Sequence, residues 1–391
     1  MGEWNPFITF KFLILSILFA SILMGERLCI AQMVRLDQMT SSQFKRGDHS
    51  TLNKPPIKSV ALSLHFELPE LGLTYSRCLD HAIDLGATHV ALIVQAQMDH
   101  IYASTINLVG AEVTSFSNLE RVITLAKARD LKVILFPILW IDQRADGEWR
   151  GRLKPRDPDR WWSEYELWLN RLAAIGERHH VDMLSIGSEL SSLEGERDRW
   201  RSLIKRLRVN FSGALTYSAN WDHFEKVDFW DLLDMIGITA YYPLTDDPSR
   251  IKEEASAKLM TDEMIERWKL IRLSLIEWLE NRKPRRPLFF TELGYPSQEG
   301  GAHKPWHYLQ SAQVDLEVQR RAFEAFRHAW RGERHLRGVN IWNIWGLGGP
   351  HDAWYTLRGK PASAEVKRLF KSMDKAPRQG HKLGSVRGKS R

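Results

Sequence analysis

The strongest constraint on the fold is a repeated alternation of short apolar runs with amphipathic helical patterns. Apolar runs of this length, bounded by polar residues, predict buried strands. Eight such runs occur, at Ile57–Leu64, Thr88–Val94, Leu131–Leu139, Met183–Gly187, Ala214–Ser218, Met235–Ala240, Leu288–Thr291 and Gly338–Trp342. Helical patterns separate many of them, as at Tyr75–Leu85, Ser117–Ala128, Trp161–His179, Asp198–Asn210, Thr261–Glu280 and Leu316–Arg331. The alternation predicts an α/β protein, a (β/α)8 TIM barrel forming a single catalytic domain over residues 57–372.

The rival architecture is a doubly wound open sheet. That fold uses a glycine-rich turn after its first strand. Here the first predicted strand runs into Leu64-His65-Phe66-Glu67, which contains no glycine. The sequence therefore favours the closed barrel.

The two ends of the chain differ from the predicted barrel. Residues 1–31 contain an apolar run, Phe12–Met24, that is short for a membrane span and typical of a signal peptide, with an uncleaved anchor as the alternative. Residues 32–56 resemble a linker. Residues 373–391 form a basic tail that is predicted to be disordered. We therefore expect an exported protein, whether periplasmic, secreted or attached to a membrane through its N-terminal segment.

The net charge of +7 first suggests a nucleic-acid partner, but its distribution argues against one. Seven Lys/Arg and a single Asp lie between Lys371 and Arg391, so the rest of the chain is nearly neutral. The two cysteines, Cys29 and Cys78, predict neither a disulfide framework nor a metal site. The dense group His179-His180-x-Asp182 precedes its strand, on the face where barrels place stabilising residues. We expect no metal and no cofactor.

Two glutamates follow apolar strands and carry the chemical argument. Glu189 ends the run Met183–Gly187, and Glu292 ends the run Leu288–Thr291. In a parallel barrel these strand ends meet at the active face. A pair of carboxyl groups there is the minimum equipment for hydrolysing a glycosidic bond. The alternative is that either glutamate is a structural carboxylate paired with an arginine.

The other predicted strand ends are polar and aromatic, which suits a sugar with hydroxyl groups and flat C–H faces. They are His65, Gln95, Gln97, Trp140, Asn220, Trp221, Tyr241, Tyr242, Trp342 and Trp345. Gln95 and Gln97 share one strand face and are equally compatible with an interior barrel layer. His65 can line the pocket or be structural. Trp140, near the loop Trp149-Arg150-Gly151, can contact substrate or fill the core.

Six blocks in order resemble glycoside hydrolase family 113. They are Gly187-Ser188-Glu189-Leu190, Leu215-Thr216-Tyr217-Ser218-Ala219-Asn220, Phe229-Trp230-Asp231, Ile236-Gly237-Ile238, Tyr242-Pro243-Leu244 and Phe290-Thr291-Glu292-Leu293-Gly294-Tyr295. The resemblance covers about residues 57–350. It implies a clan A (β/α)8 barrel and a retaining enzyme of the β-mannanase type.

The resemblance also implies roles for individual residues. Glu189 matches the general acid/base and Glu292 the nucleophile, while Tyr241 or Tyr242 matches the tyrosine that lies against the nucleophile. Many clan A enzymes have an asparagine that binds the sugar 2-hydroxyl at the position of Ser188. This departure leaves the identity of the sugar open.

Three functions compete on the sequence alone. The first is an exported retaining glycosidase that cleaves β-linked, β-mannosidic oligo- or polysaccharides, with a β-glucosidase or β-galactosidase as the alternative within the clan. The second is a catalytically inactive sugar-binding barrel, which the presence of both glutamates disfavours. The third is a nucleic-acid or anionic-surface binder acting through the tail. The expected partner is a carbohydrate, and the sequence does not indicate an oligomeric state.

Overall fold

The computed structural model describes residues 55–64, 67–110, 112–246 and 254–374. The predicted leader, most of the predicted linker, His65 and nearly all of the basic tail lie outside the described residues. Among the described residues, no helix has both the length and the apolar character needed to cross a membrane.

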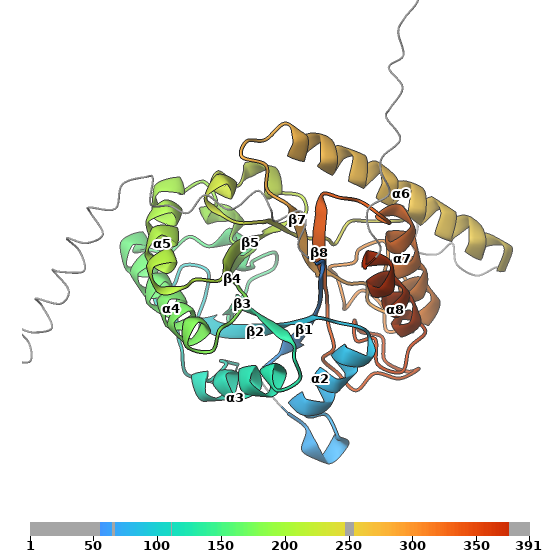
Figure 1. The fold of residues 1–391 in the computed structure, drawn as a ribbon, viewed down its shortest axis with the longest axis horizontal. Coiled ribbons are helices and arrows are strands. Elements are labelled where there is room, and N and C mark those ends of the chain that lie inside the picture. The colour runs from blue at the N-terminus through green and yellow to red at the C-terminus, as the bar shows by residue number, and fades with distance from the viewer. Residues whose placement is uncertain (1–54, 65–66, 111, 247–253, 375–391) are drawn as a thin grey trace, which may run out of the picture. The chain divides into compact units, whose positions relative to one another are not determined.

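Eight parallel strands close into a barrel in sequence order, with β1 paired to both β2 and β8 (Figure 1). The strands are β1 (Ile57–Ser63), β2 (His89–Met98), β3 (Lys132–Ile141), β4 (Met183–Ser188), β5 (Ala214–Asn220), β6 (Ile236–Thr239), β7 (Leu288–Leu293) and β8 (Leu336–Ile341). The predicted (β/α)8 barrel is confirmed, because the closed parallel ring excludes the open doubly wound sheet.

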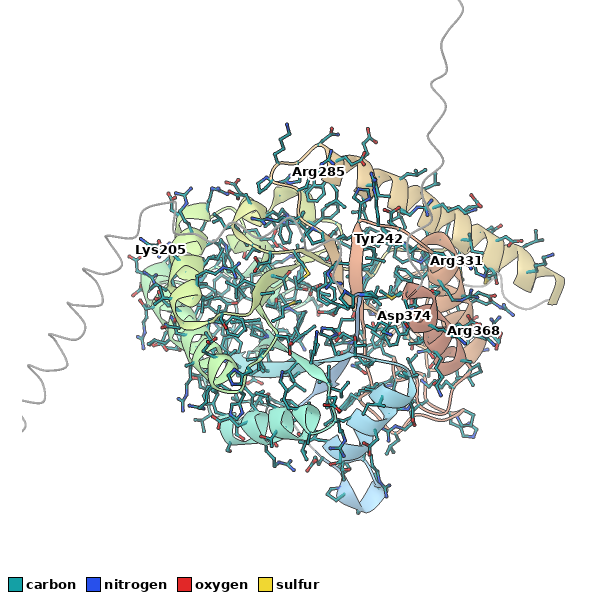
Figure 2. The ribbon with its side chains drawn as sticks, in the orientation of Figure 1. Lys205, Tyr242, Arg285, Arg331, Arg368 and Asp374 are labelled. Atoms are coloured by element: carbon teal, nitrogen blue, oxygen red, sulfur yellow. The ribbon has the colours of Figure 1, made fainter. Side chains whose placement is uncertain are left out.

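Helices cover the outside of the barrel. They are α2 (Tyr75–Asp84), α3 (Phe116–Lys127), α4 (Pro158–Arg178), α5 (Arg197–Asn210), α6 (Glu254–Glu280), α7 (Leu316–Ala329) and α8 (Ala362–Met373). Local capping fixes several helix starts. Asp157, for example, accepts the backbone N–H of Arg160 ahead of Pro158 at the first turn of α4. Charged side chains such as Lys205 and Arg368 lie on the outer helices α5 and α8 (Figure 2).

Short 3-10 helices occupy the connecting loops. They are η3 (Pro69–Leu71), η4 (Arg150–Arg152), η5 (Ser191–Leu193), η6 (Phe224–Lys226) and η7 (Trp230–Leu232). The connection from β5 to β6 contains only η6 and η7. The β3–α4 and β4–α5 loops contain η4 and η5, on the face of the barrel where the strands end.

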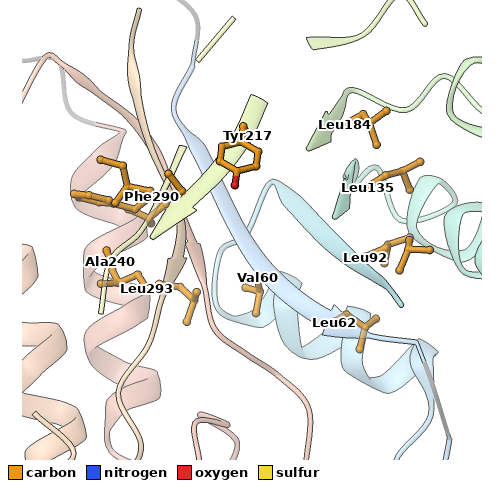
Figure 3. Packing of buried hydrophobic residues seen from close by; sticks show 14 of the residues in the cluster. Val60, Leu62, Leu92, Leu135, Leu184, Tyr217, Ala240, Phe290 and Leu293 are labelled. Carbon is orange, nitrogen blue, oxygen red and sulfur yellow. The ribbon is translucent and has the colours of Figure 1, made fainter. Parts of the chain in front are cut away.

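Side chains alternate between the two faces of each strand, and this alternation divides the hydrophobic core into two clusters. On β1, Ile57 and Ala61 face the barrel interior, whereas Val60 and Leu62 pack toward the helices (Figure 3). Trp342, at the end of β8, packs against the interior cluster. The same parity identifies the interior-facing residue at each strand end.

Candidate active site

Glu189 and Glu292 are both buried at the C-terminal ends of their strands, with exposed fractions of 8% and 3%. Ser188 lies between them, because its Oγ is 3.5 Å from Glu292 Oε1 and it precedes Glu189 in the chain. The structure therefore brings the two predicted glutamates together. Placing two carboxyl groups in one buried site creates a strong interaction between their protonation states.

The end of β6 and the segment just beyond it provide a separate hydrogen-bond donor to each carboxyl group. Thr239 Oγ1 donates to Glu189 Oε1 at 2.8 Å, and the Tyr241 hydroxyl donates to Glu292 Oε2 at 2.8 Å. These two residues are two positions apart and share one face, since side chains alternate along an extended chain. Two residues advance an extended chain by about 7 Å, so the two donors reach two different carboxyl groups.

Irregular strand ends orient the glutamates. Between Ser185 and Ser188 the pairing of β4 with β5 changes register, and the pairing of β7 with β8 shifts between Phe290 and Leu293. A bulge of this kind redirects a side chain that strict alternation would send elsewhere. Thr291 already faces the interior, where its Oγ1 lies 2.6 Å from Ser218 Oγ. The shift allows the adjacent Glu292 to face the site as well.

The backbone at Glu189 adopts an uncommon conformation, with a φ of 56°. This left-handed region costs a non-glycine residue about 1–2 kcal/mol. Surrounding contacts hold the segment in place. The Glu189 N–H donates to Ser218 O at 2.7 Å, and the next N–H, from Leu190, donates to the Tyr217 hydroxyl at 2.7 Å. Tyr217 in turn donates to the buried Glu194 at 2.8 Å.

Glu194 is a third buried carboxylate near the site. His223 Nδ1 lies 2.5 Å from its Oε2, and the nearby charge of Glu189 is one of the influences on it. Burial raises the pKa of Glu194, against the lowering effect of the hydrogen bonds from His223 and Tyr217. Sequence reasoning did not find Glu194, because its position in a loop gave no periodic signal.

Arg150 from η4 forms an ion pair with Glu189. Its Nη2 lies 2.6 Å from Glu189 Oε2, and both side chains are largely buried. The sequence analysis named this loop only as a neighbour of Trp140. Glu189 therefore has an arginine partner in addition to its contact with Thr239.

The surroundings of Glu292 shift the pKa of its carboxyl group. Burial, followed by the negative charge of Glu189, raises the pKa of Glu292, whereas Arg150, Tyr241 and Ser188 oppose the rise. The raised pKa favours a proton on Glu292 in the free protein.

The structure distinguishes the two neighbouring tyrosines. Tyr241 contacts Glu292, whereas the Tyr242 ring packs 5.5 Å from Trp268 on α6, between strand and helix. Parity along β6 explains the difference, because Thr239 and Tyr241 face inward and Tyr242 therefore faces outward.

The remaining predicted residues lie around the mouth of the barrel. Trp140 follows Ile138 on the interior face of β3 and carries the Arg144 guanidinium 4.7 Å from its ring centroid. Gln95 and Gln97 continue the face of Ile93 on β2. By the same alternation Asn220 follows the interior-facing Ser218.

Aromatic side chains form two further groups near these strand ends. The Trp221 ring stacks on Trp306 at 5.6 Å, and Trp345 lies 5.3 Å from Trp354. Within the described part of the chain, no group of three or more His, Cys, Asp or Glu side chains is arranged to hold a metal ion.

Comparisons with known proteins agree with this architecture. The model of glycoside hydrolase family 113 matches residues 74–348. A structure of the family 113 β-mannanase from Alicyclobacillus acidocaldarius, in complex with ManMIm, is 27% identical, with a TM-score of 0.69 over 83% of this chain and 100% of that chain. None of the curated proteins compared with this chain matches it.

Two more distant structures share the fold. A family 113 β-1,4-mannanase is 22% identical, with a TM-score of 0.68 over 82% of this chain and 100% of that chain. A family 5 mannosidase from Rhizomucor miehei is 10% identical, with a TM-score of 0.53 over 82% of this chain and 93% of that chain.

Proposed function

The chain belongs to glycoside hydrolase family 113, and from this premise we propose that it cleaves β-mannosidic bonds with retention of anomeric configuration. The carrying observation is the pair of buried glutamates at the ends of β4 and β7, one with a donor from Thr239 and the other with a donor from Tyr241. A structural carboxylate needs only one satisfied ion pair. Two buried carboxyl groups at strand ends on the same face of the barrel suit a two-step displacement.

In the proposed first step, the ionised Glu292 attacks the anomeric carbon while the bond to the leaving oxygen breaks. Glu189 donates its proton to that oxygen, and a glycosyl-enzyme ester forms on Glu292. In the second step Glu189 removes a proton from water, the water oxygen attacks the anomeric carbon, and Glu292 leaves as a carboxylate. The mechanism requires carboxyl groups about 5–5.5 Å apart.

Arg150 contacts the residue that transfers the proton in this cycle. Its Nη2 lies 2.6 Å from Glu189 Oε2, on the carboxyl group that donates a proton in the first step and accepts one in the second. The ion pair orients that carboxyl group at the end of β4. Arg150 thus acts through Glu189 and is a positioning residue.

The choice of mannose rests on the family and on the 27% identical β-mannanase. Ser188 occupies the position where many clan A enzymes place an asparagine, and its hydroxyl approaches Glu292 at 3.5 Å. A serine side chain is shorter and cannot present an amide to the 2-hydroxyl. Glucosides and galactosides are therefore included in the test.

The test is the intact mass of the protein after incubation with 2-deoxy-2-fluoro β-glycosides of mannose, glucose and galactose. The 2-fluorine slows both steps, and an activated leaving group such as fluoride or dinitrophenolate restores the first, so the ester accumulates. We expect one sugar to add its mass to the wild type and none to add to Glu292→Gln. The control is Glu365→Gln, because Glu365 is also 3% exposed but lies on α8.

Each result has a distinct meaning. An adduct with mannose alone supports the proposal, and an adduct with glucose or galactose alone replaces the sugar but keeps the mechanism. Labelling of Glu292→Gln would contradict the nucleophile assignment. If no reagent labels the wild type and β-mannan oligosaccharides are not hydrolysed, the non-catalytic sugar-binding barrel becomes the better description.

A further inference from the structure

A cavity of about 630 Å³ is lined by residues of the loops that follow β1, β7 and β8. Tyr308 from the β7–α7 loop and Trp345 and Trp354 from the β8–α8 loop are among its lining residues. Its volume is within the range of small-ligand pockets. Neither candidate catalytic glutamate lines it, so it is separate from the groups that would perform the chemistry.

The aromatic lining of this pocket has the character of a sugar platform. Tyr308 and Trp354 are 40% and 41% exposed, so their rings are accessible to a ligand. Trp354 lies 5.3 Å from Trp345 and 5.9 Å from Tyr308, measured between ring centroids. The electron-rich face of such a ring attracts the C–H groups on the flat side of a pyranose.

Gln298 lines the pocket and supports its wall. Its side chain is fully buried, and its Nε2 donates to His307 O at 3.0 Å. This contact anchors the backbone next to Tyr308.

A buried ion pair holds the pocket in shape. Lys360 Nζ donates to Asp352 Oδ1 at 2.7 Å and to Trp354 O at 2.8 Å. Asp352 Oδ1 also accepts the Trp354 N–H at 2.8 Å. The backbone of Trp354 is therefore fixed through its N–H and its carbonyl oxygen, which places the base of its side chain at the pocket before a ligand arrives. A site organised in advance loses less conformational entropy on binding.

Tyr355 connects the pocket to the candidate active site. Its ring lies 6.2 Å from Tyr308 on one side and 6.1 Å from Tyr241 on the other. Tyr241 donates to Glu292. The pocket is thus one aromatic ring beyond the tyrosine that binds the candidate nucleophile.

The position of the pocket around the barrel identifies which end of a substrate reaches it. In the closed strand order β8 is opposite β4, which carries Glu189 (Figure 1). The leaving group departs on the side of the acid that protonates it. The pocket beside β7 and β8 is on the other side, toward which the glycone chain extends.

We propose that this pocket is a distal glycone subsite, which binds a pyranose remote from the bond that is cleaved. The proposal rests on the proposed function for the direction of the chain. It implies that the preferred substrate is an oligosaccharide or polysaccharide with an extended glycone, and that a single-sugar glycone leaves part of the binding surface unused.

The test compares aryl β-glycosides with one leaving group and glycones of one to four β-1,4-linked mannose units. In the wild type we expect one added unit to raise kcat/KM about tenfold, which corresponds to one aromatic contact. Trp354→Ala should reduce that gain to about onefold, and Trp354→Phe should retain most of it because a ring remains. Tyr308→Ala, from the other loop, should also lower the gain.

The rate on the single-sugar glycoside shows that each variant is folded and competent. A full gain in both Trp354→Ala and Tyr308→Ala would overturn the subsite. A gain that depends on lengthening the leaving-group side instead would overturn the glycone assignment.

Calorimetry separates failure of this proposal from failure of the proposed function. If the wild type hydrolyses none of these substrates, mannohexaose is titrated into wild type and Trp354→Ala. Binding that weakens at least tenfold in Trp354→Ala would support a sugar site even though the proposed reaction had failed. Equal binding in both proteins, or binding in neither, would overturn the subsite.

Discussion

Replacing Tyr241 by phenylalanine removes a single hydrogen bond from the candidate nucleophile. The Tyr241 hydroxyl donates to Glu292 Oε2 at 2.8 Å. The adjacent Tyr242 provides a matched control, because its buried hydroxyl has no partner among the described residues and its ring packs against Trp268. The two substitutions delete the same atom at neighbouring positions, and only one of them changes the environment of Glu292.

The size of the effect follows from the charge of the acceptor. A hydrogen bond to an ionised group contributes about 1.5–3 kcal/mol. One pKa unit corresponds to about 1.4 kcal/mol, so losing the donor should raise the pKa of Glu292 by about 1–2 units. The direction follows because the donor stabilises the ionised form and lowers the pKa, against burial and the charge of Glu189.

The assay is the pH dependence of kcat/KM on an aryl β-glycoside of the sugar that labels the wild type. Only enzyme with an ionised Glu292 can attack, so the acidic limb reports that ionisation. In Tyr241→Phe the limb should move to higher pH by about 1–2 units. At a pH below both limbs, the rate should fall about 10- to 100-fold. Tyr242→Phe should keep the wild-type limb.

An unchanged acidic limb in Tyr241→Phe, with a normal fold by circular dichroism, would refute this reasoning. It would mean that Glu292 is not the group whose ionisation limits kcat/KM. Equal shifts in both variants would also refute it, because the effect would then arise from general disturbance of the β6 end.

Three further sets of substitutions probe other contacts. Arg150→Gln should move the same acidic limb to higher pH by about one unit, since the arginine charge lowers the pKa of Glu292. Arg150→Lys keeps the charge and should largely restore the wild-type limb. Identical limbs in both variants would contradict this. Lys360→Met should lower the free energy of unfolding by about 3–5 kcal/mol in a urea titration, because it leaves the Asp352 carboxylate largely buried and unpaired. Adding Asp352→Leu should recover part of that loss. No recovery would argue against the ion pair. Glu189→Gly should be more stable than Glu189→Ala by about 1 kcal/mol, because glycine adopts a φ of 56° without strain. Equal unfolding midpoints would show that the backbone relaxes.

Much of the architecture was predictable because strand and helix periods are local properties. The eight apolar runs correspond to β1–β8, and the barrel and the family resemblance are confirmed. In a parallel barrel all strand ends meet at one face, so position in the chain alone brought Glu189 and Glu292 to that face. The same rule placed Trp140 and Asn220 around the mouth of the barrel.

Other parts of the site depend on contacts between distant segments. Choosing between Tyr241 and Tyr242 requires knowing which parity of β6 faces inward, and the bulge that turns Glu292 requires the pairing of β7 with β8. Arg150 and Glu194 come from loops, where no period relates sequence position to direction.

The barrel and the two strand-end glutamates follow from the sequence, because hydrophobic periodicity and strand direction are local properties of the chain. The environment of those glutamates depends on tertiary contacts. The donor from Tyr241, the charge of Arg150 and the aromatic pocket at Trp354 each arise from long-range packing. Burial and neighbouring charge control the protonation of a carboxyl group, and both exist only once the chain has folded.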